Sequence, residues 1–133
     1  MNVCILYGGR SGEHEVSLRS AASVAANLDT DRHRLTAIGI GRDGSWHLQD
    51  RLVRRAVPGQ GEALEIRPSV STVSVVPAGG IHADGVRIEI DCVFPVLHGT
   101  YGEDGTVQGL LDIAGLPYVG AGVLGSSVSL DKE

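Results

Sequence analysis

Aromatic residues, basic residues and long apolar runs are scarce in this sequence of 133 residues. Only 4% of the residues are aromatic, which argues against a stacking platform for single-stranded nucleic acid. No stretch approaches the roughly 18 uninterrupted apolar residues of a membrane-spanning helix, and the first residues lack the basic start of a signal peptide. We therefore expect a cytoplasmic protein with no membrane partner.

Positive charge is in the minority as well. The 11 Lys and Arg residues face 16 Asp and Glu residues, a formal net charge of -5, and we expect no nucleic-acid partner because such partners attract basic surfaces. The two cysteines, Cys4 and Cys92, lie in apolar runs and form no CxxC pair or Cys/His cluster. Buried free thiols are therefore expected, without a metal site.

The composition is that of a globular domain. Hydrophobic residues make up 42% of the chain and charged residues 20%, which is typical of a folded protein with one core. Glycine is frequent, with 19 residues, but it shows no three-residue period. We therefore expect the glycines in loops and turns.

The first forty residues follow the pattern of a βαβ unit. Residues 3–7 form a short apolar run that stops at Gly8, which suits a strand buried on both faces of a parallel sheet. Residues 35–40 are expected to form the next strand, after a crossover helix. The apolar residues of that helix recur at helical spacing: Leu18, Ala21, Ala22, Ala25 and Leu28.

The middle of the chain gives weaker signals. Asp43–Gly44 is a tight-turn pair, and residues 46–48 suit the return strand of a hairpin. Residues 50–69 show no clear period and contain prolines and glycines, so we interpret them as mostly loop. Alternating apolar residues between 73 and 90 favour a second hairpin.

A further buried strand is expected at residues 92–97. Pro95 lacks an N–H group for the ladder, so it belongs near the strand's end or beside an unpaired position. Asp104 is a suitable N-cap for a helix over 105–114, and residues 118–119 suit a short last strand. This alternation of strands and helices predicts an α/β fold.

Two glycine-bearing loops, residues 8–17 and 98–105, each follow an expected strand. Open α/β sheets bind ligands beyond the carboxyl ends of their strands, and glycine lets the backbone approach a ligand closely. A carboxylate such as Glu13 could hold an ammonium group. Taken singly, the same residues also fit a plain turn, surface charges at a helix start, a solvent-facing His14 and a structural His98.

Residues 120–125 match the dinucleotide motif G-x-G-x-x-G literally. That motif also requires an acidic residue about 20 positions later, a position past residue 133, so this requirement is not testable in the sequence. The motif also lies outside the first βα turn, where a Rossmann domain places it. We therefore expect no nicotinamide or flavin.

Taken together, the loops and the residues around them resemble the N-terminal part of D-alanine–D-alanine ligases. The resemblance runs from Val3 to Glu133, apart from roughly residues 45–90. The segments that carry it are GGRSGEHEVSL at 8–18, FPVLHGTYGEDGTVQG at 94–109, GLPYVGAGV at 115–123 and SLDK at 129–132.

The resemblance implies a three-layer, Rossmann-like pre-ATP-grasp fold with a mainly parallel sheet and helices on both faces. Residues 1–125 would form the substrate-binding domain, and 126–133 would begin the connection to a central ATP-grasp domain. Members of the family serve peptidoglycan synthesis and use ATP and Mg²⁺ to convert one D-alanine to D-alanyl phosphate, which a second D-alanine attacks. They are homodimers. We expect this chain alone to fold, to bind no cofactor and to be inactive.

The resemblance also assigns roles to single residues. Glu13 matches the carboxylate that holds the ammonium of the first D-alanine, and it is the catalytic candidate. Lys132 matches a lysine that reaches toward an ATP phosphate, and no metal ligand is expected. The remaining positions matched to the first-substrate pocket are Gly8, Gly9, Val16, Ser17, His98 and Glu103.

Two other functions remain open from the sequence. The chain could belong to a D-alanine–D-lactate ligase, since the loop that distinguishes the two ligases is not among these residues. It could also be a non-catalytic module for dimerisation or for binding a small ligand.

Overall fold

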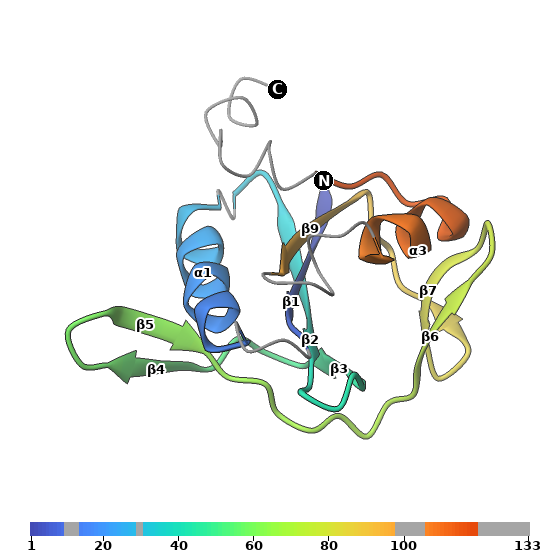
Figure 1. Ribbon diagram of the computed structural model, residues 1–133. Helices are drawn as coiled ribbons and strands as arrows, with labels where there is room; N and C mark the ends of the chain where they lie inside the picture. The colour runs from blue at the N-terminus through green and yellow to red at the C-terminus, as the bar shows by residue number, and fades with distance from the viewer. Residues whose placement is uncertain (10–13, 29–30, 98–105, 120–133) are drawn as a thin grey trace.

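A four-stranded sheet forms the centre of the fold in the computed structural model, which describes residues 1–9, 14–28, 31–97 and 106–119 (Figure 1). Within these residues, one helix covers each face of this sheet. The elements are β1 Asn2–Gly8, α1 His14–Asn27, β2 Arg34–Ile40, β3 Trp46–Gln49, β4 Arg54–Val57, β5 Gly61–Leu64, β6 Val73–Val76, β7 Gly80–Ala83, β8 Val86–Arg87, β9 Cys92–Leu97 and α3 Thr106–Ala114.

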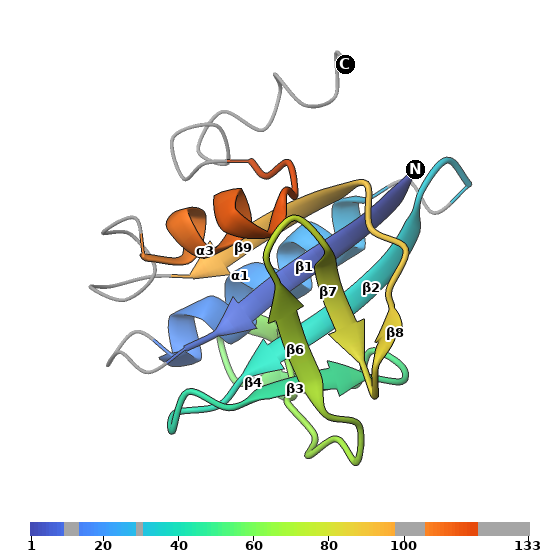
Figure 2. The same cartoon turned by 90° about the vertical axis from the view of Figure 1, so that its right-hand side faces the viewer.

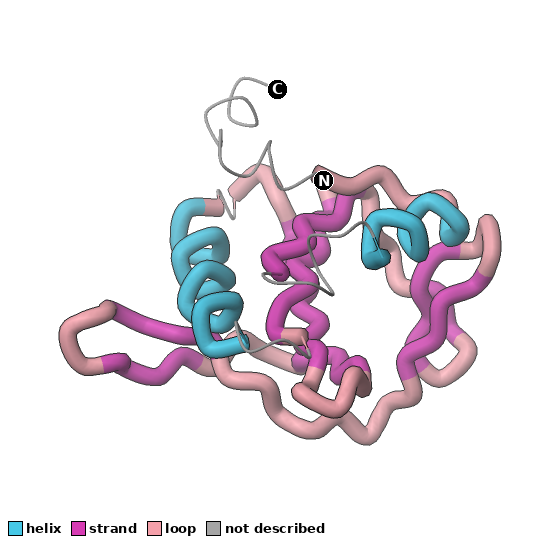
Figure 3. Tube along the Cα trace, viewed as in Figure 1, coloured by secondary structure: helices cyan, strands magenta, loops and turns pink. Residues whose placement is uncertain are grey.

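The sheet has the strand order β3-β2-β1-β9 and is mainly parallel. β1 pairs in parallel with both β2 and β9, and β3 joins antiparallel at the edge of β2. Colouring by secondary structure shows this sheet between the helix α1 on one side and α3 on the other (Figure 3). The expected strands at residues 3–7, 35–40, 46–48 and 92–97 are therefore confirmed.

β1 is buried on both faces, as its unbroken apolar run predicts. Cys4 and Leu6 face the core that α3 covers, whereas Ile5 and Tyr7 face the core that α1 covers. All four side chains have no exposed surface. A central strand needs apolar residues at every position, because helices exclude water from both of its sides.

The helix α1 lies on the sheet through the face that the sequence pattern predicts. Leu18, Ala21, Ala22 and Ala25 are all buried against it. Three alanines on this face keep the helix close to the strands, since a small side chain adds little height between two backbones. The result is one of the two cores of the domain, with Ile5, Tyr7 and Val96 on the sheet side.

Both cysteines are free, as expected, but only one is fully buried. Cys4 has no exposed surface, and burial raises the pKa of its thiol to about 12. Cys92 is half-buried, and burial together with the nearby Asp91 carboxylate raises the pKa of its thiol. The prediction of a buried thiol is thus confirmed for Cys4 and wrong for Cys92, which begins an edge strand.

We therefore expect iodoacetamide at pH 8 to leave Cys4 unmodified in the folded chain, because a neutral, buried thiol is not nucleophilic. Cys92 should react, though more slowly than an ordinary exposed cysteine. Mass spectrometry of the digested protein would measure both sites, with the urea-denatured chain as the fully reactive control. Equal modification of Cys4 in the folded and denatured chain would contradict its burial in β1.

Residues 50–69 are not mostly loop, because they contain the antiparallel hairpin β4–β5. Figure 1 shows this hairpin extending past α1. Its strands are rich in charged residues and carry little β-propensity of their own. Ala63 and Leu64 are 1% and 0% exposed because β5 packs on α1. Tertiary packing, which the local sequence does not reveal, makes this a hairpin.

Residues 73–90 form a sheet of three strands. The expected two-stranded hairpin is therefore wrong in its number of strands. β7 lies between β6 and β8 and pairs antiparallel with both. Figure 2 shows β6 and β7 side by side in front of the central sheet. The short run Gly80–Ala83 escaped prediction because Ile81 is its single large apolar residue, yet that side chain is completely buried in the α3 core.

Pro95 takes the place that its missing donor requires. Val93 donates its N–H to Pro117 on the side of β9 that faces away from β1, and Val119 donates back to Val93. Pro95 lies two residues after Val93, so its backbone nitrogen, which has no N–H to donate, also faces away from β1. The expected short strand at 118–119 is a single bridge between Tyr118 and Val93.

The helix expected at 105–114 is α3, and its predicted cap, Asp104, lies outside the described residues. The predicted boundary between residues 125 and 126 also lies outside them. Neither described helix is both long and apolar enough to cross a membrane.

Candidate functional site

The carboxyl ends of β1 and β9 form the topological switch point of the sheet, where the connections after two neighbouring strands leave to opposite faces. From β1 the chain continues to α1 on one face of the sheet, and from β9 it continues to α3 on the other face. Ligands of open α/β sheets bind at such a switch point. Gly8 and Leu97 are register partners at the ends of the two strands. The two predicted loops therefore begin side by side, although residues 10–13 and 98–105 are outside the described part.

Two glycines turn the chain sharply at the end of β1. Gly8 and Gly9 have φ angles of +96° and +106°, a backbone region that other residues rarely adopt. The N–H of Gly9 donates to the carbonyl of Ile40 at 2.8 Å, which ties the turn to the end of β2. A Cβ atom on Gly8 would lie 2.2 Å from that same carbonyl oxygen. A glycine is therefore required here by the turn itself.

Ser17 joins the ends of β1 and β9 from the first turns of α1. Its side chain has no exposed surface. The hydroxyl oxygen accepts the N–H of Gly8 at 2.8 Å, and the hydroxyl proton is donated to the carbonyl of Val96. The hydroxyl thus stands between two strands where a direct ladder bond would otherwise form. Its predicted contact with substrate stays a prediction.

His14 is buried, not solvent-facing, and the sequence reasoning missed its role. Its side chain is 7% exposed, and Nδ1 lies 2.7 Å from the carbonyl oxygen of Gly9. A carbonyl only accepts hydrogen bonds, so Nδ1 carries the proton. The spacing from the glycine turn to the helix start is the signal that could have suggested this contact.

Glu15, in the first turn of α1, connects three separate elements. Its carboxylate lies 2.6 Å from Arg55 on β4 and 3.5 Å from Arg42 after β2. The hydrogen bond from Arg55 is the main reason that the pKa of Glu15 is lowered. The helix dipole also favours an acidic residue at this end. These pairs link the hairpin to the helix start, but exposed ion pairs of this kind add little stability.

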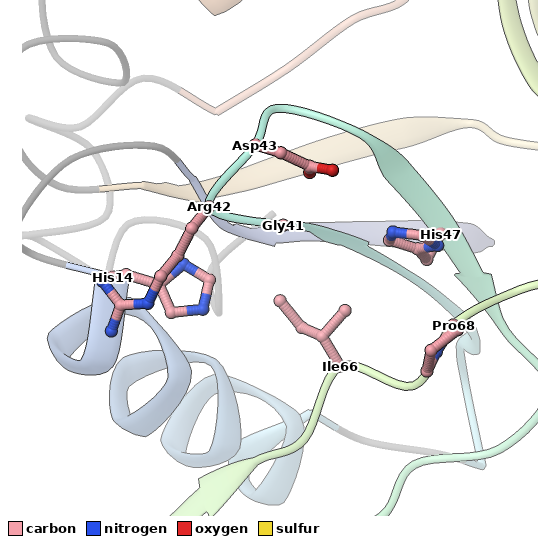
Figure 4. A pocket seen from close by; sticks show the side chains of 7 residues that line it. All are labelled: His14, Gly41, Arg42, Asp43, His47, Ile66 and Pro68. Atoms are coloured by element: carbon pink, nitrogen blue, oxygen red, sulfur yellow. The ribbon is translucent and has the colours of Figure 1, made fainter.

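A pocket of about 450 Å³ lies beside this helix start, at the end of β2 (Figure 4). The Ile66 side chain points into it from the segment after β5. Ile66 also packs against Gly8 and Gly39, where a Cβ atom would lie 2.7 and 2.6 Å from it. The residues that line the pocket are His14, Gly41, Arg42, Asp43, His47, Ile66 and Pro68.

Asp43 and His47, two polar residues that line this pocket, are connected through Ser45 by hydrogen bonds. The backbone N–H of Ser69 donates to Nδ1 of His47, so Nε2 carries the proton and donates to the Ser45 hydroxyl at 2.8 Å. Ser45 in turn donates to Asp43 at 2.6 Å, and this bond is the main reason that the pKa of Asp43 is lowered. Both ring nitrogens of His47 are thus hydrogen-bonded, and this series of bonds holds the loop after β2 in place.

The structure brings together the described half of the predicted site. Gly8, Gly9, Val16 and Ser17 lie at the end of β1 and the start of α1. The other predicted residues lie outside the described part of the chain: Glu13, His98, Glu103 and Lys132. Within the described part, no group of three or more His, Cys, Asp or Glu side chains could hold a metal ion.

Related sequences cover this chain completely but are much longer. The D-alanine–D-alanine ligase of Treponema denticola is 45% identical over 139 residues, which cover 100% of this chain and 38% of that protein. The D-alanine–D-alanine ligase of Solibacter usitatus is 48% identical over 133 residues, which cover 100% of this chain and 32% of that protein. The chain therefore spans well under half the length of these relatives.

Solved structures share the three-layer fold with its mainly parallel sheet. The VanG D-Ala:D-Ser ligase from Enterococcus faecalis has a TM-score of 0.70 at 32% identity, covering 89% of this chain and 35% of that one. The D-alanine–D-alanine ligase from Coxiella burnetii has a TM-score of 0.70 at 31% identity, covering 90% of this chain and 34% of that one. The family described as D-ala D-ala ligase N-terminus matches residues 2–121, and the chain belongs to this family.

Proposed function

We propose that this chain forms the first-substrate side of a D-alanine–D-alanine ligase. One observation carries the proposal: Gly8 and Leu97 are register partners at the switch point of the sheet. The loops after β1 and β9 therefore start next to each other, and both lie within the family match. Two separate loops at one sheet edge can surround a small amino acid, whereas either loop alone is only a turn.

The first D-alanine has an ammonium group, a carboxylate and one methyl group. In our proposal Glu13 holds the ammonium group by a charge-assisted hydrogen bond, with His98 and Glu103 beside it. The N-terminus of α1 presents a positive dipole end and free N–H groups, which favour a nearby negative charge. Val16 and Ser17 shape the base of the pocket at this helix start.

When bound, ATP and Mg²⁺ supply a phosphoryl group and positive charge, so that the D-alanine carboxylate gains a leaving group before the second amino group attacks. In this chain Lys132 is the residue proposed to face ATP. The parts that the relatives have beyond the matched region would hold the rest of the nucleotide and the metal. The proposal also includes a cytoplasmic homodimer that serves peptidoglycan synthesis.

A chimera tests this function. Residues 1–133 would replace the matched part of the Treponema denticola ligase, and ADP release would be measured with ATP, Mg²⁺ and D-alanine. The chimera is expected to release ADP in step with D-alanyl-D-alanine, and the 133-residue chain alone is expected to release none. A folded but inactive chimera would contradict the proposal, and a non-catalytic module would then explain the chain better. Turnover by the chain alone would contradict its expected inactivity.

The substitution Glu13→Gln in this chimera is expected to raise the KM for the first D-alanine about 10- to 150-fold. A charge-assisted hydrogen bond contributes roughly 1.5–3 kcal/mol, and the neutral amide keeps the size of the side chain. The KM for the second D-alanine and the melting temperature should change little. Glu62→Gln, on the exposed side of β5, is the matched control. Unchanged kinetics for both substrates would remove Glu13 from the site.

A further inference from the structure

His14 ties the start of α1 to the glycine turn. Its imidazole is nine-tenths buried, and Nδ1 donates to the carbonyl of Gly9 at 2.7 Å. A buried imidazole that made no such bond would be unfavourable, because burial removes its hydrogen bonds to water. The contact is therefore a fixed part of the folded structure, and it joins residues on either side of the four-residue segment that contains Glu13.

Gly9 is held at both of its peptide groups. Its N–H donates to Ile40 at the end of β2, and its carbonyl accepts from His14. Gly9 has a φ of +106°, and as a glycine it could adopt many other backbone conformations. Two hydrogen bonds to two different elements select one of these conformations. Without the imidazole donor, the carbonyl of Gly9 would be free to turn.

The other end of the contact is equally fixed. His14 begins α1, and the helix start is anchored by the buried bond of Ser17 to Val96. Figure 4 shows the His14 ring on the wall of the pocket, beside the Arg42 side chain. A donor on a packed helix can position a loop better than a donor on another loop.

We propose that His14 is a positioning residue of the first-substrate site. It acts through Gly9, because its Nδ1 proton fixes the carbonyl of Gly9 in the first glycine-bearing loop, residues 8–17. This inference rests on the proposed function. The consequence is specific: loss of the donor should weaken binding of the first D-alanine, whereas the second D-alanine and the fold should be affected much less.

The test uses two substitutions in the active chimera. Phe in His14→Phe fills the same space without a donor, and it is expected to raise the KM for the first D-alanine about 10-fold, as for one lost buried hydrogen bond. The amide nitrogen of His14→Asn takes nearly the place of Nδ1, so this variant is expected to stay within about 3-fold of the unmodified chimera. The KM for the second D-alanine should change less than 3-fold in either variant, because the loss of one hydrogen bond has little effect on a site that does not contact it.

Structure and stability are measured on the 133-residue chain. Nitrogen NMR of the histidine rings should show the proton of neutral His14 on Nδ1. Urea unfolding of the Phe and Asn variants is measured as well, and KM is compared at a temperature at which both are fully folded, so that a difference in KM between them is not a difference in folding. A neutral His14 with its proton on Nε2 would overturn the proposal, because Nδ1 could then not donate to Gly9.

The outcomes separate this inference from the proposed function. An active chimera whose first-site KM is the same with Phe as with His at position 14 would overturn the positioning role alone. Equal losses in the Phe and Asn variants would overturn it as well, because they would show that the donor is not what matters. A chimera that is folded but inactive before any substitution would contradict the proposed function, and the positioning role would be lost with it.

Discussion

The substitution Gly8→Ala is expected to lower the free energy of unfolding of this chain by about 2–6 kcal/mol. One part comes from the backbone, since a φ of +96° is strained for alanine and such strain is worth about 1–3 kcal/mol. The other part comes from collision, because the new Cβ would lie 2.2 Å from the carbonyl oxygen of Ile40. Overpacking of this kind adds about 1–3 kcal/mol.

The neighbours of Gly8 have no room to yield. The carbonyl of Ile40 is held by the N–H of Gly9, and Gly8 itself is paired with β2 and β9 on its two sides. A movement that relieves the contact would have to open the sheet at the switch point. Because a domain of this kind has a total stability of about 5–15 kcal/mol, the variant is expected to lose a large fraction of it.

Urea unfolding followed by circular dichroism measures this effect, and Gly59→Ala is the matched control. Gly59 also has a positive φ, +74°, but a Cβ atom there would meet nothing within 4 Å. The control therefore contains the backbone strain without the collision, and it should lose only the strain contribution of about 1–3 kcal/mol. Equal losses in the two variants would show that the contact with Ile40 relaxes freely.

The substitution Ser17→Ala is expected to lower the free energy of unfolding by about 1.5–5.5 kcal/mol. It removes the hydroxyl that accepts from Gly8 and donates to Val96, and it leaves both backbone groups buried without a partner. Each unsatisfied buried group has a penalty of about 1–3 kcal/mol. Alanine is the better helix former by at most about 0.5 kcal/mol, which offsets only a small part.

Ser23→Ala, in the same helix, provides the control. Ser23 is exposed, so the same chemical change there should be neutral or slightly stabilising. Amide hydrogen exchange adds a local measurement, since the N–H of Gly8 should exchange faster in Ser17→Ala than in the unmodified chain. Equal stability of the Ser17 and Ser23 variants would mean that a water molecule or a direct strand contact replaces the hydroxyl.

Local sequence patterns predict the central elements because these elements are defined by their own periodicity. The apolar run at residues 3–7 is buried on both faces, and the helical stripe from Leu18 to Ala25 faces the core. Gly39 also predicts a contact, because a glycine inside a strand often marks the close approach of another part of the chain. In the structure the Ile66 side chain packs on it. The hairpin β4–β5 was missed because its strands are charged and owe their burial to α1.

The sequence by itself determined that β1, α1, β2 and β9 exist and that glycine-bearing loops follow β1 and β9. Only the tertiary structure decided that β9 lies beside β1, that Ser17 bonds across to Val96, 79 residues away, and that His14 is buried against Gly9. The physical reason is the separation of the interacting residues along the sequence. A strand or helix is encoded in the spacing of neighbouring residues, whereas a contact between distant segments depends on how every element packs at once.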